Sequence, residues 1–131
     1  LFLCTKPLHH GGTLARLRPT MPLHLGPYTL DNPVVLAPMS GISDRPFRLI
    51  CRRYGAGLVV SEMVASEALV RDDLIAQQKA SFDPDQGLVS VQIAGASPER
   101  MAVAAQINHR AGAQVIDINM GCPVKKVVNC M

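Results

Sequence analysis

The stretch that decides the fold of this chain is Val115-Ile116-Asp117-Ile118-Asn119-Met120-Gly121-Cys122-Pro123. Its branched apolar residues predict a short strand that is buried on both faces, as in a parallel α/β sheet. The glycine and the proline end the strand and fix the backbone on either side of Cys122. Parallel α/β sheets and barrels carry their chemistry at the carboxyl ends of the strands, where this thiol would lie. The stretch therefore predicts a strand that delivers Asp117, Asn119 and Cys122 to one functional turn.

A rhythm of strand followed by helix extends from this stretch back to residue 34. Apolar runs predict strands at 34–37, 58–61, 88–93 and 115–119, which start roughly 24 to 30 residues apart. Helices are predicted at 43–54, at 65–79 in two pieces and at 97–111, capped by Ser43 and Ser97 and ended by Gly55 and Gly112. This is the spacing of βα units, whose crossovers need about a dozen residues or more. A short hairpin over 23–30 precedes them and could plug the bottom of a barrel.

Four strands of this kind fit either a doubly wound sheet or the first half of an eight-stranded barrel. No Gly-x-Gly-x-x-Gly pattern follows the first strand, which disfavours the dinucleotide-binding doubly wound fold. We therefore expect residues 21–131 to form the N-terminal half of a (β/α)8 TIM barrel, incomplete after the fourth strand, with that strand as an exposed apolar edge. Residues 1–20 carry three basic residues and no acid, and we expect them to be a disordered or spurious extension.

The composition is that of a soluble globular domain, with 48% apolar and 18% charged residues and no apolar run of the ~18 residues that span a membrane. The net charge of +3 comes entirely from residues 1–20, so charge alone does not argue for nucleic-acid binding. The four cysteines form no Cys-x-x-Cys pair and the histidines complete no zinc pattern, so we expect no metal site. Without a secretory signal, we expect reduced thiols and a cytoplasmic protein.

Unusual side chains follow three of the predicted strands, namely Pro38-Met39, Gln92, and Asn119 with Cys122. In a barrel these strand ends share one rim. Methionine can lie against an aromatic ring, and side-chain amides can pair with ring carbonyl and N–H groups, so a flat hydrogen-bonding ligand is indicated. An ordinary thiol, with a pKa of about 8.5, is mostly protonated at pH 7, which suits proton donation. A nucleophilic Cys122 would need an activating base, and no histidine lies nearby in the sequence.

Linked motifs along the chain resemble those of the tRNA-dihydrouridine synthases, closest to the bacterial B-type branch. They are Ala37-Pro38-Met39-Ser40-Gly41-Ile42-Ser43-Asp44-Arg45-Pro46-Phe47-Arg48, Ser61-Glu62-Met63, Val91-Gln92-Ile93-Ala94-Gly95, Asp117-Ile118-Asn119-Met120-Gly121-Cys122-Pro123 and Lys125-Lys126-Val127. The resemblance spans about residues 23–127. It implies a TIM-barrel flavoenzyme that uses FMN and NADPH to reduce a uridine of tRNA to 5,6-dihydrouridine, and that is a monomer at full length.

The resemblance also implies roles for particular residues. Cys122 would protonate C5 of the uracil while the reduced flavin gives hydride to C6, and Asn119 would hold the uracil. The target base must leave its stack to reach such a site. The flavin would be lined by Pro38, Met39 and Ser40 and bonded at its isoalloxazine edge by Gln92, and tRNA phosphates would lie near Lys125 and Lys126.

Several of these residues have an alternative that needs no ligand. The Asn119 side chain could cap a turn, Gln92 could bond a neighbouring loop, and the two lysines could simply be solvated. Cys51 is expected to be a small buried hydrophobe in a helix. Glu62 could help to orient the site, but an ion pair with Arg45 or Arg48 is favoured.

Two alternative functions also stay open. One is another pyrimidine-acting FMN barrel, similar to a dihydroorotate dehydrogenase, and the other is a non-catalytic fragment. The family continues past the cysteine with a Gly/Ala-rich segment, further strands, the loops that hold the FMN phosphate and a helical tRNA-binding domain. This chain reads Val127-Val128-Asn129-Cys130-Met131 instead, so we expect a weakly active or inactive form that holds FMN poorly.

Overall fold

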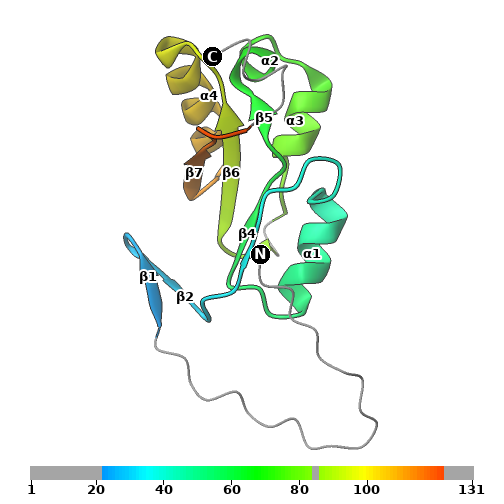
Figure 1. Ribbon diagram of the computed structural model, residues 1–131, viewed down its shortest axis with the longest axis vertical. Helices are drawn as coiled ribbons and strands as arrows, with labels where there is room; N and C mark the ends of the chain where they lie inside the picture. Colours follow the sequence, from blue (N-terminus) through cyan, green and yellow to red (C-terminus); the bar gives the residue numbers. More distant parts are fainter. Residues whose placement is uncertain (1–21, 84–85, 123–131) are drawn as a thin grey trace, which may run out of the picture.

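A computed structural model describes residues 22–83 and 86–122 of the chain (Figure 1). Their elements, in chain order, are β1 (Leu23–Leu25), β2 (Tyr28–Leu30), β3 (Val35–Leu36), α1 (Arg45–Arg53), β4 (Leu58–Val60), β5 (Val64–Ala65), α2 (Ser66–Val70), α3 (Leu74–Ala80), β6 (Val89–Ala94), α4 (Pro98–Arg110) and β7 (Val115–Ile118). The predicted extension over 1–20 lies outside the described residues, as do Lys125 and Lys126. The four predicted strands and the intervening helices are confirmed as β3, β4, β6 and β7 with α1 to α4.

The main sheet is parallel, and its strands β3, β4, β6 and β7 lie side by side in chain order. β3 pairs with β4, and β4 and the short β5 pair in turn with one side of β6. β7 pairs with β6 along its other side, with Gln92 opposite Asp117. A doubly wound sheet would reverse its strand order partway, whereas a barrel wall keeps it. The fold is therefore α/β with a parallel sheet, consistent with part of a TIM barrel.

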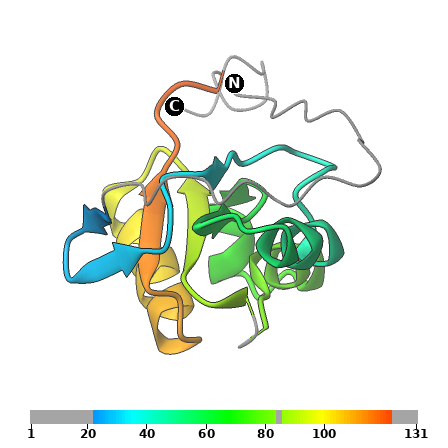
Figure 2. The same ribbon diagram turned by 90° about the horizontal axis from the view of Figure 1, so that it is seen from below.

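The helices pack on one side of this sheet, as Figure 2 shows from below. Right-handed crossovers between neighbouring strands in chain order carry every helix to the same face. Successive side chains of a strand point to opposite faces, and in β6 Val89, Val91 and Ile93 belong to the hydrophobic core beneath the helices. Ser90 and Gln92 of β6 point to the other face, and they are buried too. The face away from the helices is thus polar at the centre of the sheet.

The start of α1 differs from the prediction, because Asp44 and not Ser43 is its cap. The Asp44 carboxylate accepts a hydrogen bond from the backbone N–H of Phe47 at 2.9 Å. Two capping residues stand next to each other here, and Ser43 instead turns its hydroxyl back into the preceding loop. The predicted start of α4 is confirmed, with Ser97 as the cap and Pro98 at the first helical position.

The segment after β4 is confirmed as a helix in two pieces, α2 and α3. Asp73 separates them by capping α3, since its carboxylate accepts from the backbone N–H of Ala76 at 2.9 Å. The two-residue strand β5 was not predicted, because it is too short to show a hydrophobic period. The predicted hairpin is confirmed as β1 and β2, with Gly26 in the left-handed conformation (φ 57°) at its turn.

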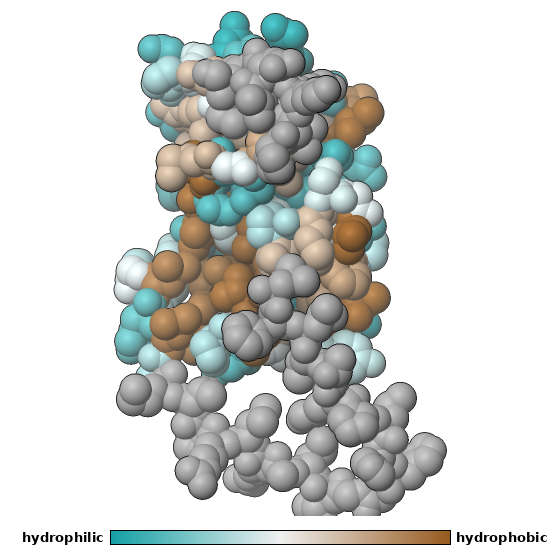
Figure 3. All heavy atoms as spheres, in the orientation of Figure 1, coloured by the Kyte–Doolittle hydropathy of each residue, from teal (hydrophilic) through white to brown (hydrophobic). Residues whose placement is uncertain are grey.

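The prediction that the strand at 115–119 is buried on both faces is wrong for the described structure. Three residues of β7 are half-buried, and Ile118 is 54% exposed. The reason is that β7 has a strand partner on one side only among the described residues. Apolar side chains also gather over the hairpin in the space-filling view of Figure 3. In β1, Leu23 is 43% and Leu25 is 39% exposed.

Candidate functional site

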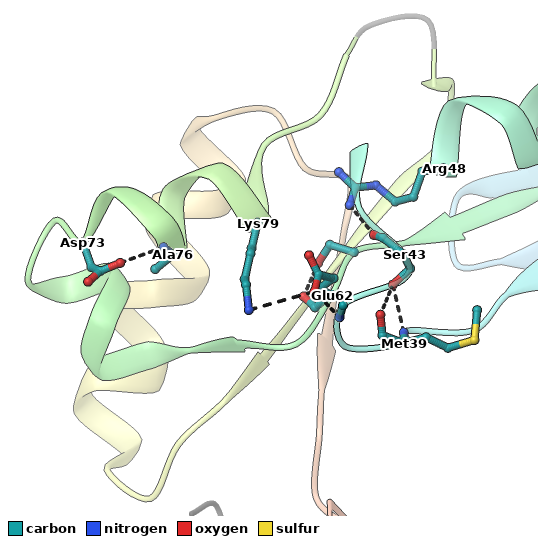
Figure 4. A network of polar contacts seen from close by, with 9 residues as sticks. Met39, Ser43, Arg48, Glu62, Asp73, Ala76 and Lys79 are labelled. Atoms are coloured by element: carbon teal, nitrogen blue, oxygen red, sulfur yellow. Dashed lines mark hydrogen bonds and ion pairs between the residues drawn. The ribbon is translucent and has the colours of Figure 1, made fainter. Parts of the chain in front are cut away.

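Hydrogen bonds to the backbone of Met39 hold the loop after β3 in a turn. The Met39 backbone N–H donates to the Ser43 hydroxyl oxygen at 2.8 Å, and the Met39 carbonyl accepts from the backbone N–H groups of Ile42 and Ser43. Figure 4 shows Ser43 between Met39 and Arg48. Pro38 and Met39 are half-buried in this loop and Ser40 is exposed. The three residues predicted to line a flavin are therefore held in one tight turn at the carboxyl end of β3.

Glu62 ties this loop to the end of the neighbouring strand β4. Its Oε1 accepts from the backbone N–H of Gly41 at 2.6 Å and lies 3.9 Å from the Nζ of Lys79 on α3 (Figure 4). The predicted ion pair of Glu62 with Arg45 or Arg48 is wrong. Glu62 is almost fully buried, and it uses its carboxylate to fix a backbone loop and to face Lys79.

The two arginines are used elsewhere. Arg48 is fully buried, and its guanidinium donates to the backbone carbonyls of Ser43 and Ser81. Burial lowers the pKa of Arg48 from its ordinary value. Arg45 pairs with Asp83, and hydrogen bonding within the pair raises the pKa of Arg45 and lowers that of Asp83. The sequence shows that these arginines are present, but their partners depend on the three-dimensional fold.

Gln92 of β6 is bonded on both sides of its amide. Its Nε2 donates to the Asp117 carboxylate at 2.6 Å, and its Oε1 accepts from the Asn119 Nδ2 at 3.1 Å. Its backbone N–H donates to the buried Ser61 hydroxyl at 3.0 Å, which joins it to the end of β4. The predicted alternative was a bond from Gln92 to a neighbouring loop; its amide bonds Asp117 of the neighbouring strand and Asn119, which follows that strand. Its contact with a flavin stays a prediction.

Asn119 forms the turn that carries Cys122. Its Oδ1 accepts from the backbone N–H groups of Gly121 at 3.1 Å and of Cys122 at 2.9 Å. Its own backbone N–H donates to the carbonyl of Ile93. The turn-capping alternative for Asn119 is therefore seen in the structure, and uracil binding stays a prediction. Cys122 is half-buried at the end of this turn, with a free thiol.

The structure thus brings together four residues, Gln92, Asp117, Asn119 and Cys122, which we call the β6–β7 cluster. Gln92, Asn119 and Cys122 were predicted to bind or react with a ligand, whereas Asp117 was predicted to reach the same turn without a role in binding or catalysis. The signal for Asp117 is its position in the strand two residues before Asn119, since alternate residues share a face. The loop at 38–43 lies at the same carboxyl edge of the sheet, and Lys125 and Lys126 lie outside the described residues.

Over residues 22–83 and 86–122, no group of three or more His, Cys, Asp and Glu side chains is placed to hold a metal ion. None of the described helices combines the length and the apolar character that a membrane crossing requires. Cys51 packs against the core from α1, as predicted, but it is half-buried and not fully buried. Burial raises the pKa of its thiol.

Comparison with known proteins agrees with the arrangement of motifs on the strand ends. The profile of the family described as dihydrouridine synthase (Dus) matches residues 35–131, which is well over half of the chain. This chain belongs to the dihydrouridine synthase family. The predicted resemblance is therefore confirmed, and the β6–β7 cluster and the loop at 38–43 both lie within the matched region.

This chain is identical to individual relatives at about half of the aligned positions. The chain is 53% identical over 107 residues to tRNA-dihydrouridine synthase B of Pseudomonas aeruginosa, covering 82% of this chain and 32% of that protein. It is 52% identical over 105 residues to the protein of the same name from Shewanella oneidensis, covering 80% and 33%. It is also 52% identical over 110 residues to that of Xanthomonas campestris, covering 82% and 32%. The chain spans about a third of the length of the curated relatives it matches.

Proposed function

We propose that this chain supplies the uracil- and flavin-facing residues of a tRNA-dihydrouridine synthase, which reduces a uridine of tRNA to 5,6-dihydrouridine. The observation that carries the proposal is the hydrogen-bonded series from Gln92 through Asn119 to Cys122, at the carboxyl ends of neighbouring parallel strands. That edge is where barrel enzymes carry their chemistry. The reaction itself is proposed from the relatives, which are tRNA-dihydrouridine synthases.

The donors and acceptors of the cluster fit a flavin and a uracil. A side-chain amide has two N–H donors and a carbonyl with two lone pairs. Bonds inside the protein use one N–H and one lone pair of Gln92, so one of each is left for a ring edge. Asn119 uses its oxygen twice and one N–H, so one N–H is left for a uracil carbonyl. When bound, FMN would supply the hydride for C6, with NADPH as the reductant.

Cys122 is proposed as the acid that completes the reduction. A hydride at C6 leaves the pair of electrons of the broken C5–C6 double bond at C5, and the proton of the Cys122 thiol would go there. A thiol S–H is itself a proton donor, so the step calls for no neighbouring base. The backbone N–H of Cys122 is held by Asn119, which fixes where the thiol lies relative to the residue that would hold the base.

The binding of tRNA and of the FMN phosphate is proposed on the family resemblance. Lys125 and Lys126 would contact tRNA phosphates, and the target uridine would leave its stack to reach Cys122. We propose that the 131-residue chain holds FMN weakly on its own, because the family places its phosphate-binding loops after the matched stretch. A monomeric full-length enzyme and a cytoplasmic location belong to the same proposal.

A chimeric enzyme tests this function. Replacing the matching 107-residue stretch of the Pseudomonas aeruginosa relative by that of this chain should give a protein that binds FMN and forms dihydrouridine in tRNA with NADPH. Cys122→Ala in the chimera should lower the rate by about a hundredfold or more, the usual effect of a positioned acid, while FMN stays bound. Cys51→Ala, which changes a cysteine that packs against the core, is the matched control and should keep the activity.

The same chimera separates the alternatives. Reduction or oxidation of free orotate or dihydroorotate without any action on tRNA would favour the enzyme similar to dihydroorotate dehydrogenase. A chimera that folds and binds FMN but acts on neither substrate would favour the non-catalytic fragment. Titration of the unmodified 131-residue chain with FMN, followed by flavin fluorescence, tests the weak binding, and a stoichiometric yellow complex would contradict it.

A further inference from the structure

We infer that Asp117 is a positioning residue, whose carboxylate fixes the amide orientation of Gln92 within the β6–β7 cluster. The inference rests on the proposed function, because it concerns which groups of Gln92 face a bound ring. The Asp117 carboxylate accepts a hydrogen bond from the Gln92 Nε2 at 2.6 Å. Its effect on the reaction would therefore pass through Gln92.

The first step of the argument is that a carboxylate can only accept hydrogen bonds. Asp117 lies directly opposite Gln92 in the sheet register, so both side chains leave the same face of β6 and β7. The ionised carboxylate has no N–H or O–H to offer, so Gln92 must present its NH₂ group to it. The reverse orientation would place the amide oxygen of Gln92 against a negative charge.

The second step is that the far end of the series is a pair of donors. The backbone N–H groups of Gly121 and Cys122 can only donate, so Asn119 must present its oxygen to them. The NH₂ of Asn119 then faces Gln92, whose oxygen accepts from it. The Asp117 carboxylate at one end and the two backbone N–H groups at the other therefore require the same orientation of the Gln92 and Asn119 amides. The oxygen and nitrogen of a side-chain amide are assigned from such hydrogen-bond partners.

The third step is that removal of the Asp117 carboxylate would leave the Gln92 Nε2 without its acceptor. Gln92 is only 6% exposed, so its Nε2 has little access to water once Asp117 is gone. The amide would then swing toward any acceptor in the site, including one of the bound ring. Asp117→Asn is the conservative change, because its Oδ1 can still accept from Gln92. Asp117→Ala removes the acceptor.

The first test is made on the 131-residue chain without any ligand. Nuclear magnetic resonance of the Gln92 side-chain amide should show two well-separated proton signals with a cross-peak to the Asn119 side chain. Asp117→Ala should move both signals toward free-glutamine values, and Asp117→Asn should leave them near their original places. Unchanged Gln92 signals in a folded Asp117→Ala chain would overturn the inference, as would loss of the cross-peak in Asp117→Asn with a folded spectrum.

The second test uses the chimera and a double-mutant cycle. Asp117→Ala and Gln92→Ala should each lower kcat by about tenfold, equivalent to one lost bond in the transition state, with little change of KM for tRNA. Because Asp117 acts through Gln92, the double variant should be no slower than either single one. The inference would be overturned if the kcat of the double variant fell by the product of the two single effects. It would also be overturned if Asp117→Asn lowered kcat as much as Asp117→Ala. An inactive unmodified chimera would count against the proposed function only, since the resonance experiment still decides the role of Asp117.

Discussion

The Glu62 carboxylate accepts a hydrogen bond from the backbone N–H of Gly41, 2.6 Å away, and so joins the loop after β3 to the end of β4. A buried carboxylate needs partners of this kind, because an unpaired charge in the interior is costly. The second group that faces it is the half-exposed ammonium of Lys79, at 3.9 Å. The loop proposed to line the flavin is therefore held in place from the neighbouring strand.

Glu62→Ala should lower the free energy of unfolding by about 1–3 kcal/mol, the range for losing a charged hydrogen-bond partner. Glu62→Gln keeps an acceptor for Gly41 and should lose less. Lys79→Met removes only the half-exposed end of the ion pair and should cost under about 1 kcal/mol. Urea denaturation of the three variants measures the difference. A loss in Lys79→Met that equals the loss in Glu62→Ala would show that the ion pair, and not the bond to the loop, matters.

Arg48→Met should be among the most destabilising single changes in α1. It keeps an unbranched apolar stem but removes the guanidinium, which leaves the carbonyls of Ser43 and Ser81 without their buried donor, at a cost of about 3 kcal/mol or more. Arg53 on the same helix is exposed, and Arg53→Met is the matched control, expected within about 0.5 kcal/mol of the original chain. Thermal and urea unfolding check both. Equal stability of the two variants would contradict the structural role of Arg48.

Gly95→Ala should destabilise the end of β6 by about 1–3 kcal/mol, the usual cost of overpacking. A Cβ there would overlap the buried Ser66 hydroxyl and lie 3.1 Å from the Met101 sulfur. Gly121→Ala is the matched control, because a Cβ at that glycine meets nothing within 4 Å. The free energy of unfolding of both variants, measured in urea, decides the matter. If Gly95→Ala proves as stable as Gly121→Ala, α2 and β6 are not packed as described.

Cys51 should react slowly with iodoacetamide in the folded chain. Burial raises the pKa of this thiol, so at pH 8 a smaller fraction is thiolate than in the unfolded chain, where the pKa is about 8.5. The same shift means that folding stability should decline as the pH rises above the unfolded value, since the folded state resists losing the proton. Mass spectrometry of the Cys51 peptide across pH 7–10 checks the prediction, with the urea-unfolded chain as control. Identical pH profiles in the two states would refute it.

The order and type of the elements could be predicted from sequence because they depend on local signals. Ser97 with Pro98 marks the start of α4, and evenly spaced apolar runs mark the parallel strands. The choice of Asp44 over Ser43 as the cap of α1 could not be predicted, since both residues accept hydrogen bonds equally well. It depends on the Met39 turn, which draws Ser43 away from the helix.

The members of the site could be predicted, but not the bonds that join them. Gln92, Asn119 and Cys122 stand out by residue type at strand ends. The pairing of Gln92 with Asp117 depends on the register of β6 against β7, which no local pattern specifies. The partner of Glu62 was mistaken for the same reason, because charge counting favours an arginine whereas the fold supplies a backbone N–H and Lys79.

The alternation along β6 has a consequence for folding errors. Val89, Val91 and Ile93 meet the helices, while Ser90 and Gln92 face the other way, and all are buried. A slip of one residue would exchange the two sets and bury polar groups beneath the helices. The misaligned strand would then lose both the apolar contacts with the helices and the hydrogen bonds of Gln92. A chain that packs Val89, Val91 and Ile93 against the helices has therefore already turned Gln92 toward the opposite face, from which Asp117 also extends, so the core and the site depend on the same alternation.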